Sequence, residues 1–403
     1  MRGDGGRLQD GIFWRHGERP PPSLRLVLLD ISADATPKQA RNGLMRIVEC
    51  IQQLRRGEVR DLAGQPEHTR SESAAQFAGL RLLLGFGRRL FDAEQHDPPL
   101  VTVPRPDFLS YLPRSAEPFP TLPWNGARRE GEADVLVQLT ADSEAAVDAA
   151  AVDIWQVIVD HELPLAVIES YPGFGRSDGR GWLGFHDGVS NLRTDERPAA
   201  MVAGQHPPWM ADGTYLALLR LRVDLAAWRR LSRSQQELLV GRDKFSGAPL
   251  NGTERGRSGE LCPVAAPPQS ASQAAVWADH KDPPQVTDPV LEMSHVHRAN
   301  QNRASGSAAG GLRMFRQGYE FLDALGPDGP SLGLTFVSFQ RDLSTVQHLL
   351  HLPGWLGDVN FGGRTQHGPG EPPALRFVSL IAGGLYAVPP RAAPFPGAAI
   401  FAG

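Results

Sequence analysis

The sequence has little cysteine and no long apolar run. Cys50 and Cys262 are its only cysteines, and they lie far apart in 403 residues. Because they form neither a disulfide framework nor a metal-binding cluster, we expect two reduced thiols and a cytoplasmic protein. No apolar run approaches the roughly 18–20 residues that span a bilayer, so we expect no membrane helix. The opening MRGDGGRLQD has neither an apolar leader core nor a twin-arginine pair, and we expect no export.

An excess of charge of one sign is also missing. The formal net charge is -4, which gives no electrostatic reason to expect nucleic acid as a partner. Hydrophobic residues make up 41% of the chain and charged residues 21%, the balance of a globular protein and not of a disordered one. The length leaves room for two domains of ordinary size.

Four segments of the chain each combine an apolar strand with a helix that follows it. The first helix is predicted from Pro37 to about Leu54, with Thr36 as its N-cap and proline in its first turn. The four strands are LRLVLLDI (Leu24–Ile31), DVLVQLTAD (Asp134–Asp142), YLALLRLRVD (Tyr215–Asp224) and LTFVSFQRD (Leu334–Asp342).

The second and fourth of these segments resemble each other. Each has an apolar strand, a Gln near its end, an Asp shortly after that Gln and then a helix. This likeness predicts a duplicated α+β unit with antiparallel sheets and helices on one face, although strand–Asp–helix is also a common transition by chance. The glycine-rich YPGFGRSDGRG places a boundary near residues 170–180, which divides the chain into units 1–175 and 176–403. Residues 251–288 and 304–311 are predicted loops.

Two residues stand out chemically, although neither is decisive alone. His295 follows a proline-bearing loop and precedes a glycine-rich run, so it could supply the single neutral imidazole that a haem iron needs, or be an ordinary histidine. If the segment is extended, His297 points to the opposite face and only one of the two can ligate. Asp187 lies in GFHDGV, where it is equally compatible with a turn and with a catalytic acid.

Together the motifs indicate a family. GFHDGVSN resembles the GFxDG signature of dye-decolorizing peroxidases. Further segments resemble other landmarks of that family, in family order from about residue 9 to the C-terminus. They are LQDGI, GFGRRLFD, DVLVQLTADS, YLALLRLRVDLAAW, GRDKFSGAPL, SHVHRAN, LRMFRQGYEF, GLTFVSFQRDL and AGGLYAVPP.

The resemblance implies an α+β fold of two ferredoxin-like units, with haem b held mainly by the second. It assigns His295 as the iron ligand, with Asp187 and Arg316 on the opposite haem face. The further haem contacts that it implies are Gly188, Val189, Ser190, Asn300, Gln301 and Asn302. Two departures affect the haem edge, since His297 stands where the family often has arginine and Gln301 where it often has proline.

The implied activity is a peroxidase that uses hydrogen peroxide to oxidise electron-rich aromatic or dye-like donors. Asp187 would move a proton between the peroxide oxygens, and Arg316 would stabilise the charge that develops. A haem carrier or sensor, or a biosynthetic haem enzyme on the same scaffold, are the alternatives. Homo-oligomerisation is compatible with the resemblance, and encapsulation in a protein shell is not expected because the chain stops at PGAAIFAG.

Two further roles stay open. Asp342 is a candidate hydrogen-bond partner of the iron-ligating histidine, or else a helix N-cap. Trp355, Tyr319 and Tyr386 could relay electrons to the surface, although core packing is the simpler interpretation.

Overall fold

The structure is a computed structural model of the whole chain. It describes residues 7–13, 19–60, 64, 66–97, 99–112, 132–192, 195–256, 261–265, 286–299, 313–327, 329–350 and 377–401.

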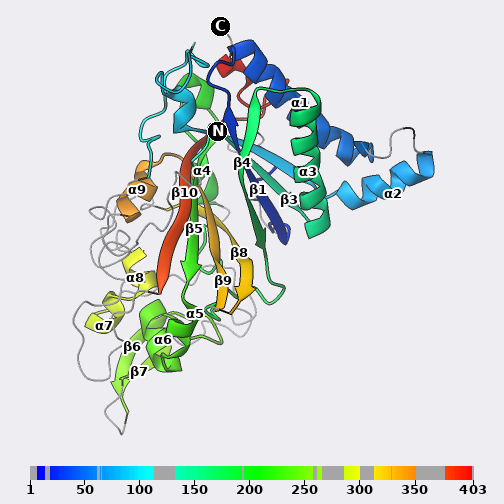
Figure 1. The fold of residues 1–403 in the computed structure, drawn as a ribbon. Helices are drawn as coiled ribbons and strands as arrows, with labels where there is room; N and C mark the ends of the chain where they lie inside the picture. The colour runs from blue at the N-terminus through cyan, green and yellow to red at the C-terminus, as the bar shows by residue number, and fades with distance from the viewer. Residues whose placement is uncertain are drawn as a thin grey trace.

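Strands and helices alternate along both halves of the chain (Figure 1). The first half contains β1 (Ser23–Ile31), α1 (Pro37–Arg55), α2 (Glu67–Phe77), β2 (Arg81–Gly87), β3 (Val135–Ala141), α3 (Glu144–Asp160) and β4 (Leu165–Phe174). The second half contains α4 (Arg197–Met201), β5 (Thr214–Val223), α5 (Leu225–Arg229), α6 (Arg233–Val240), β6 (Leu250–Arg255), β7 (Leu261–Ala265), α7 (Pro289–Glu292), α8 (His295–Ala299), β8 (Phe315–Gly326), β9 (Gly329–Gln340), α9 (Ser344–Leu350) and β10 (Val378–Val388).

Eight of the strands close into one antiparallel ring in the order β1-β3-β2-β10-β5-β9-β8-β4. Within the ring, the first half contributes the order β4-β1-β3-β2 and the second half contributes β10-β5-β9-β8. Each half therefore has the strand order of a ferredoxin-like β-α-β-β-α-β unit, in which the fourth strand lies beside the first. The predicted fold class is confirmed. The two segments that resemble each other in sequence contain β3 and β9, which are the third strands of their units.

The two halves meet at short seams. Tyr386 and Ala387 of β10 pair with β2, whereas β4 and β8 are joined through Phe174 and Glu320. The predicted boundary after residue 175 falls directly behind β4, and it stays a prediction. YPGF, which we assigned to an irregular boundary, is the end of β4, because its backbone pairs with β1.

Strand β1 packs on both of its faces, since side chains alternate from one face to the other along a strand. In β1, Leu24, Leu26 and Leu28 belong to a cluster that draws on all eight strands and fills the ring. Val27 and Leu29 point the other way and pack with side chains of α1 and α3. These two helices lie side by side over the outer face of the first sheet (Figure 1).

The first helix is encoded locally as predicted. Thr36 and Gln39 form a capping box at the start of α1, and Pro37 opens its first turn. The helices of the second half are arranged differently. The connection from β5 to β8 includes α5, α6 and α8, and it forms a lobe at the lower end of the ring and not a long helix over the second sheet (Figure 1).

One segment that we predicted as a loop contains a hairpin. Within residues 251–288, β6 and β7 pair in antiparallel register between Leu250–Ala265 and Arg255–Leu261. The alternating pattern is short and interrupted by Gly and Pro, which hid it in the sequence. The predicted loop at 304–311 lies outside the described residues. Both cysteines are unpaired, as predicted.

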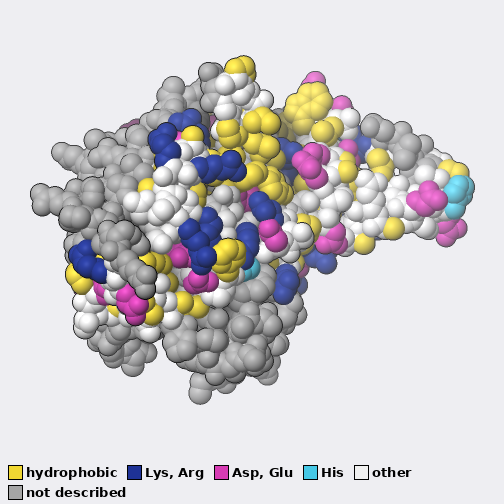
Figure 2. Space-filling view, turned by 90° about the horizontal axis from the view of Figure 1, so that it is seen from below, with side chains coloured by type: hydrophobic (Ala, Val, Ile, Leu, Met, Phe, Trp, Pro, Cys, Tyr) yellow, Lys and Arg dark blue, Asp and Glu magenta, His cyan; other side chains and the backbone are white. Residues whose placement is uncertain are grey.

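The described surface carries charges of both signs. Seen from below, Lys and Arg side chains have Asp and Glu among them (Figure 2). Among the described helices, none is long and apolar enough to cross a membrane.

Candidate active site in the second half

A cavity of about 250 Å³ lies over the outer face of the second sheet. The sheet contributes apolar side chains from alternate positions of β5 and β9, and α9 closes one side. The apolar lining includes Leu219, Leu221, Val223, Leu334, Phe336, Val346, Leu349 and Leu350. The polar lining side chains are His186, Asp187, Arg242, His295, Arg316 and Glu320.

Strand β8 places polar groups in this cavity because its side chains alternate between the two faces of the sheet. Arg316, Gly318 and Glu320 face the cavity, whereas Phe315 and Tyr319 belong to the cluster inside the ring. Gly318 makes room for another side chain: a Cβ there would come within 2.7 Å of Asp187 Oδ2. The Asp187 carboxylate therefore lies directly against the backbone of β8, between Arg316 and Glu320.

The loop that carries Asp187 is held in an unusual backbone conformation. The Asp187 amide donates to Gly179 O at 2.9 Å, and the Asp187 Oδ1 accepts the Gly188 amide at 2.7 Å. Gly188 has φ of 75°, which suits glycine, but Ser190 has φ of 59°, a region that most side chains avoid. Such a conformation persists only where the surroundings enforce it.

Arginine side chains enforce that conformation. Arg316 Nη2 donates to Val189 O at 3.0 Å, and Arg242 Nη2 donates to Ser190 Oγ at 2.7 Å. Arg313 Nη2 donates to Ser190 O at 3.2 Å. Each guanidinium offers several fixed donors, so it can hold backbone carbonyls in one geometry.

Asn191 connects the same loop to the backbone of Arg316. Its Nδ2 donates to Arg316 O at 2.8 Å, and its Oδ1 accepts the Arg316 amide at 3.1 Å. The side-chain amide thus replaces a neighbouring strand at this position of β8. It fixes the point from which the Arg316 side chain enters the cavity.

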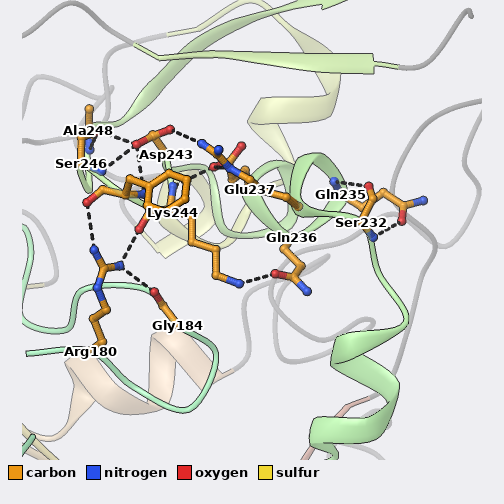
Figure 3. Close-up of polar contacts among 12 residues, drawn as sticks. Arg180, Gly184, Ser232, Gln235, Gln236, Glu237, Asp243, Lys244, Ser246 and Ala248 are labelled. Atoms are coloured by element: carbon orange, nitrogen blue, oxygen red, sulfur yellow. Dashed lines mark hydrogen bonds and ion pairs between the residues drawn. The ribbon is translucent and has the colours of Figure 1, made fainter. Parts of the chain in front are cut away.

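A second anchor lies at the outer end of the loop (Figure 3). Arg180 Nη1 donates to Gly184 O at 2.7 Å and to Lys244 O at 2.6 Å, while Nη2 donates to Phe245 O at 3.0 Å. The Asp187 loop is therefore bound to the turn that follows α6. Lys244 is held in turn by the side chain of Gln236, as Figure 3 shows.

His295 begins the short helix α8 and faces the cavity together with Val296. Desolvation, assisted by the positive charges of Arg316 and Arg242, lowers the pKa of His295 to about 3. Its imidazole is therefore neutral at pH 7, the form that binds metal ions. The segment is helical and not extended as we assumed, but His297 still does not line the cavity; its Nδ1 lies 2.7 Å from Ser294 Oγ.

The structure brings most of the predicted site residues together. His295, Asp187, Arg316, Gly188 and Val189 line one cavity although they come from three separate segments. Ser190 lies beside it and contacts Arg242. The remaining predicted contacts, Asn300, Gln301 and Asn302, lie outside the described residues.

Arg242 and Glu320 are cavity residues that the sequence analysis missed. Arg242 is 4% exposed, and burial together with the charge of Arg316 lowers its pKa to about 9. Arg242 lies in GRDKFSGAPL. The sequence analysis used this segment only as a family landmark and assigned no role to its residues. Glu320 follows Arg316 by four residues, and the period of two along a strand would have placed both on one face.

Glu320 is a buried carboxyl group with an unusual pKa. Burial raises its pKa from the usual 4.5 to about 8, and the negative charge of Asp187 acts in the same direction. Its Oε2 accepts the Trp182 amide at 2.9 Å. This hydrogen bond lowers the pKa of Glu320, but by less than burial raises it. At neutral pH Glu320 therefore holds its proton.

Three residues for which further roles stayed open have structural contacts, and those roles stay predictions. Asp342 Oδ1 accepts the Ser344 amide at 3.0 Å at the start of α9, so its carboxylate caps that helix. Tyr319 and Tyr386 are buried in the cluster inside the ring, while Trp355 lies outside the described residues. Among the described residues, no group of three or more His, Cys, Asp or Glu side chains is arranged to hold a metal ion.

Comparison with known proteins identifies the family. A family model described as Dyp-type peroxidase, C-terminal, matches residues 178–393, which include β5 to β10 and all the polar cavity residues named above. The chain belongs to the Dyp-type peroxidase family. Members of the family bind haem and use peroxide as the oxidant, so the protein is a haem peroxidase.

Individual relatives are distant. The chain is 26% identical to the dye-decolorizing peroxidase of Thermobifida fusca (strain YX) over 350 residues, 81% of this chain and 71% of the relative. It is 28% identical to the deferrochelatase of Shigella flexneri serotype 5b (strain 8401), but that match spans 54% of this chain and only half of the relative. The crystal structure of a DyP-type peroxidase from Cellulomonas bogoriensis has the same fold, with a TM-score of 0.68 at 22% identity and 99% coverage of both chains.

The cavity of this peroxidase fits a haem. A haem presents a flat apolar ring, two carboxylates and a metal that needs an axial ligand. The cavity offers apolar walls, the guanidinium groups of Arg242 and Arg316, and the neutral imidazole of His295. Each of these chemical requirements has a counterpart among its side chains.

We predict that Asn191→Ala destabilises the protein. The substitution leaves the amide and the carbonyl of Arg316 without their side-chain partner, which should lower the free energy of unfolding by about 1–3 kcal/mol. Urea unfolding measures this difference. Asn251→Ala, at an exposed position of β6, is the control and should change the unfolding free energy by less than about 0.5 kcal/mol. Equal stabilities of the two variants would contradict the role of Asn191.

We also predict that the contribution of Glu320 to stability falls as pH rises between about 4.5 and 8. In this window the unfolded chain loses the Glu320 proton while the folded chain keeps it, so deprotonation favours unfolding. Glu320→Gln removes this contribution and should stabilise the protein by about 3 kcal/mol at pH 7, with little effect near pH 4. Thermal unfolding of both proteins across this range measures the effect. Parallel pH dependences would show that Glu320 titrates normally.

Proposed function

We propose that this peroxidase binds haem b in the cavity of the second half, with His295 as the iron ligand and Asp187 and Arg316 on the opposite haem face. One observation carries the proposal: a neutral imidazole, a carboxylate and a guanidinium from three separate segments converge on one largely apolar cavity. The further contacts would come from Gly188, Val189, Ser190, Asn300, Gln301 and Asn302. When bound, haem supplies the iron at which peroxide is reduced.

Asp187 is the residue that moves the proton. Cleavage of the peroxide bond requires that a proton leave one oxygen and reach the other, so that the departing oxygen leaves as water. A carboxylate can accept and return this proton at one oxygen atom. Asp187 Oδ1 is occupied by the Gly188 amide, which assigns the proton transfer to Oδ2, the atom that lies over Gly318.

Arg316 stabilises the negative charge that develops on the departing oxygen. Burial lowers its pKa and the charge of Asp187 raises it, but a guanidinium remains protonated at neutral pH. Its side chain is already held by Val189 O, and its backbone by Asn191. A donor fixed before the reaction needs little reorganisation during it, which is the main source of electrostatic catalysis.

The reducing substrates that we propose are electron-rich aromatic or dye-like molecules, each of which gives up one electron at a time. A cytoplasmic location, a homo-oligomeric state and the absence of encapsulation stay predictions. So does an electron relay through surface aromatics.

The deferrochelatase relatives favour a second candidate function on the same scaffold. Their name denotes the removal of chelated iron, and they match 54% of this chain. In this alternative the cavity binds haem as a carrier, a sensor or an iron-releasing site, and peroxide turnover is minor. Asp187→Ala would then leave haem binding and iron release intact.

Peroxide turnover of the haem-loaded protein distinguishes these functions. We expect Asp187→Asn and Arg316→Leu to retain haem but to react with peroxide about 10²–10⁴-fold more slowly than the wild type. Stopped-flow absorbance at the Soret band measures the rate, and oxidation of an aromatic donor measures turnover. Glu254→Gln, exposed on β6, is the control and should behave as the wild type. A wild-type protein that binds haem but shows negligible turnover would favour the second function.

A further inference from the structure

Glu320 and His186 are the ionisable groups of the described cavity lining to which neither the fit to haem nor the proposed function gives a task. Only 8% of the surface of Glu320 is exposed, and it shares a strand face with Arg316 and Gly318. Neighbours on one face of a strand are roughly 7 Å apart, and the Asp187 carboxylate lies over Gly318. Glu320 is thus one step along β8 from the carboxylate that moves the proton.

Exposed charged groups beyond the end of β4 act on Glu320. Its backbone pairs with Phe174 at the seam between β4 and β8. Just beyond β4, Arg176 Nη2 and Asp178 Oδ2 form an exposed ion pair at 2.7 Å, and both charges act on Glu320. The charges of Asp187 and of this solvated ion pair therefore both act on Glu320.

The stoichiometry of peroxide reduction requires protons from outside the cavity. One peroxide, two protons and two electrons give two water molecules, and the electrons come from two aromatic donors that each lose one. Asp187 moves a proton that the peroxide already carries, so the first bond cleavage needs none from solvent. The two further protons must reach the cavity from solvent while the donors are oxidised.

We propose that Glu320 is the proton carrier that links solvent to Asp187 during the reduction that follows peroxide cleavage. For each of the two protons, the O–H bond of the Glu320 carboxyl breaks and an O–H bond forms on Asp187. Asp187 then passes the proton to the oxygen that leaves as the second water, and solvent near the Arg176–Asp178 pair returns a proton to Glu320. This inference rests on the proposed function of the cavity, since it requires Asp187 to be the acceptor.

A purely structural role for Glu320 is the competing explanation. Its Oε2 accepts the Trp182 amide at 2.9 Å, and a Cβ on Gly181 would come within 2.7 Å of its Oε1, so the carboxyl also supports the wall of the cavity. Glu320→Gln separates the two roles. The carboxamide oxygen can still accept the Trp182 amide, but the side chain cannot carry an exchangeable acid proton.

The test compares two rate constants of the haem-loaded protein. We expect Glu320→Gln to retain wild-type haem content and the wild-type second-order rate constant with peroxide, because that step needs no outside proton. Its kcat with an aromatic donor should fall by about tenfold or more. The wild-type kcat should decline as pH rises through about 8, where Glu320 loses its proton. The kcat of the variant should show no such decline.

The controls separate failure of this inference from failure of the proposed function. Glu320→Asp keeps a carboxyl group and should recover part of kcat together with a decline of kcat at high pH, whereas Glu254→Gln should match the wild type in both rate constants. If Glu320→Gln keeps the wild-type kcat and the same decline of kcat above about pH 8, Glu320 is not the carrier, although the peroxidase function stands.

If that variant does not fold, the pH dependence of the wild type decides alone: a kcat that does not decline near pH 8 overturns the inference. Absence of turnover in the wild type would overturn the proposed function and this inference with it.

Discussion

The site depends on a face of the second sheet that no long helix covers within the described part of the chain. In the first half, α1 and α3 bury the outer face of the sheet; in the second, the corresponding connection between β5 and β8 forms a separate lobe. The exposed part of that face becomes the floor of the cavity. Because side chains alternate along β8, the same strand that packs Tyr319 inside the ring presents Arg316, Gly318 and Glu320 to the cavity.

The apolar walls of the cavity determine the protonation states of its ionisable side chains. Burial keeps His295 neutral and Glu320 protonated, while Arg242 and Arg316 keep their charge. Charged groups removed from water are costly unless they find partners. Arg316 finds one in the backbone carbonyl of Val189, and Arg242 finds one in the hydroxyl of Ser190. The loop in turn adopts the strained conformation at Ser190 that these contacts enforce. Catalytic geometry and stability are therefore coupled here.

Much of the fold could be predicted from local patterns. The capping box of α1 and the alternation of the four long strands depend on neighbouring residues, and the structure agrees closely with them. The convergence of His295 and Asp187 could be inferred only from motif likeness, since they are over a hundred residues apart. Arg242 was missed because its role depends on tertiary contacts, and the β6–β7 hairpin because Gly and Pro interrupt its short alternating pattern. Glu320 could have been found from the periodicity of β8, but its protonation follows from burial that no local pattern reveals.

The central claim is that His295, and not its neighbour His297, binds the haem iron. Haem titration of the apoprotein, followed at the Soret band, tests this most directly in the wild type, His295→Ala and His297→Ala. We predict that His297→Ala gives the wild-type spectrum and affinity, whereas His295→Ala binds haem weakly and recovers a ligated spectrum when imidazole is added. A wild-type spectrum in His295→Ala, or its loss in His297→Ala, would contradict the account.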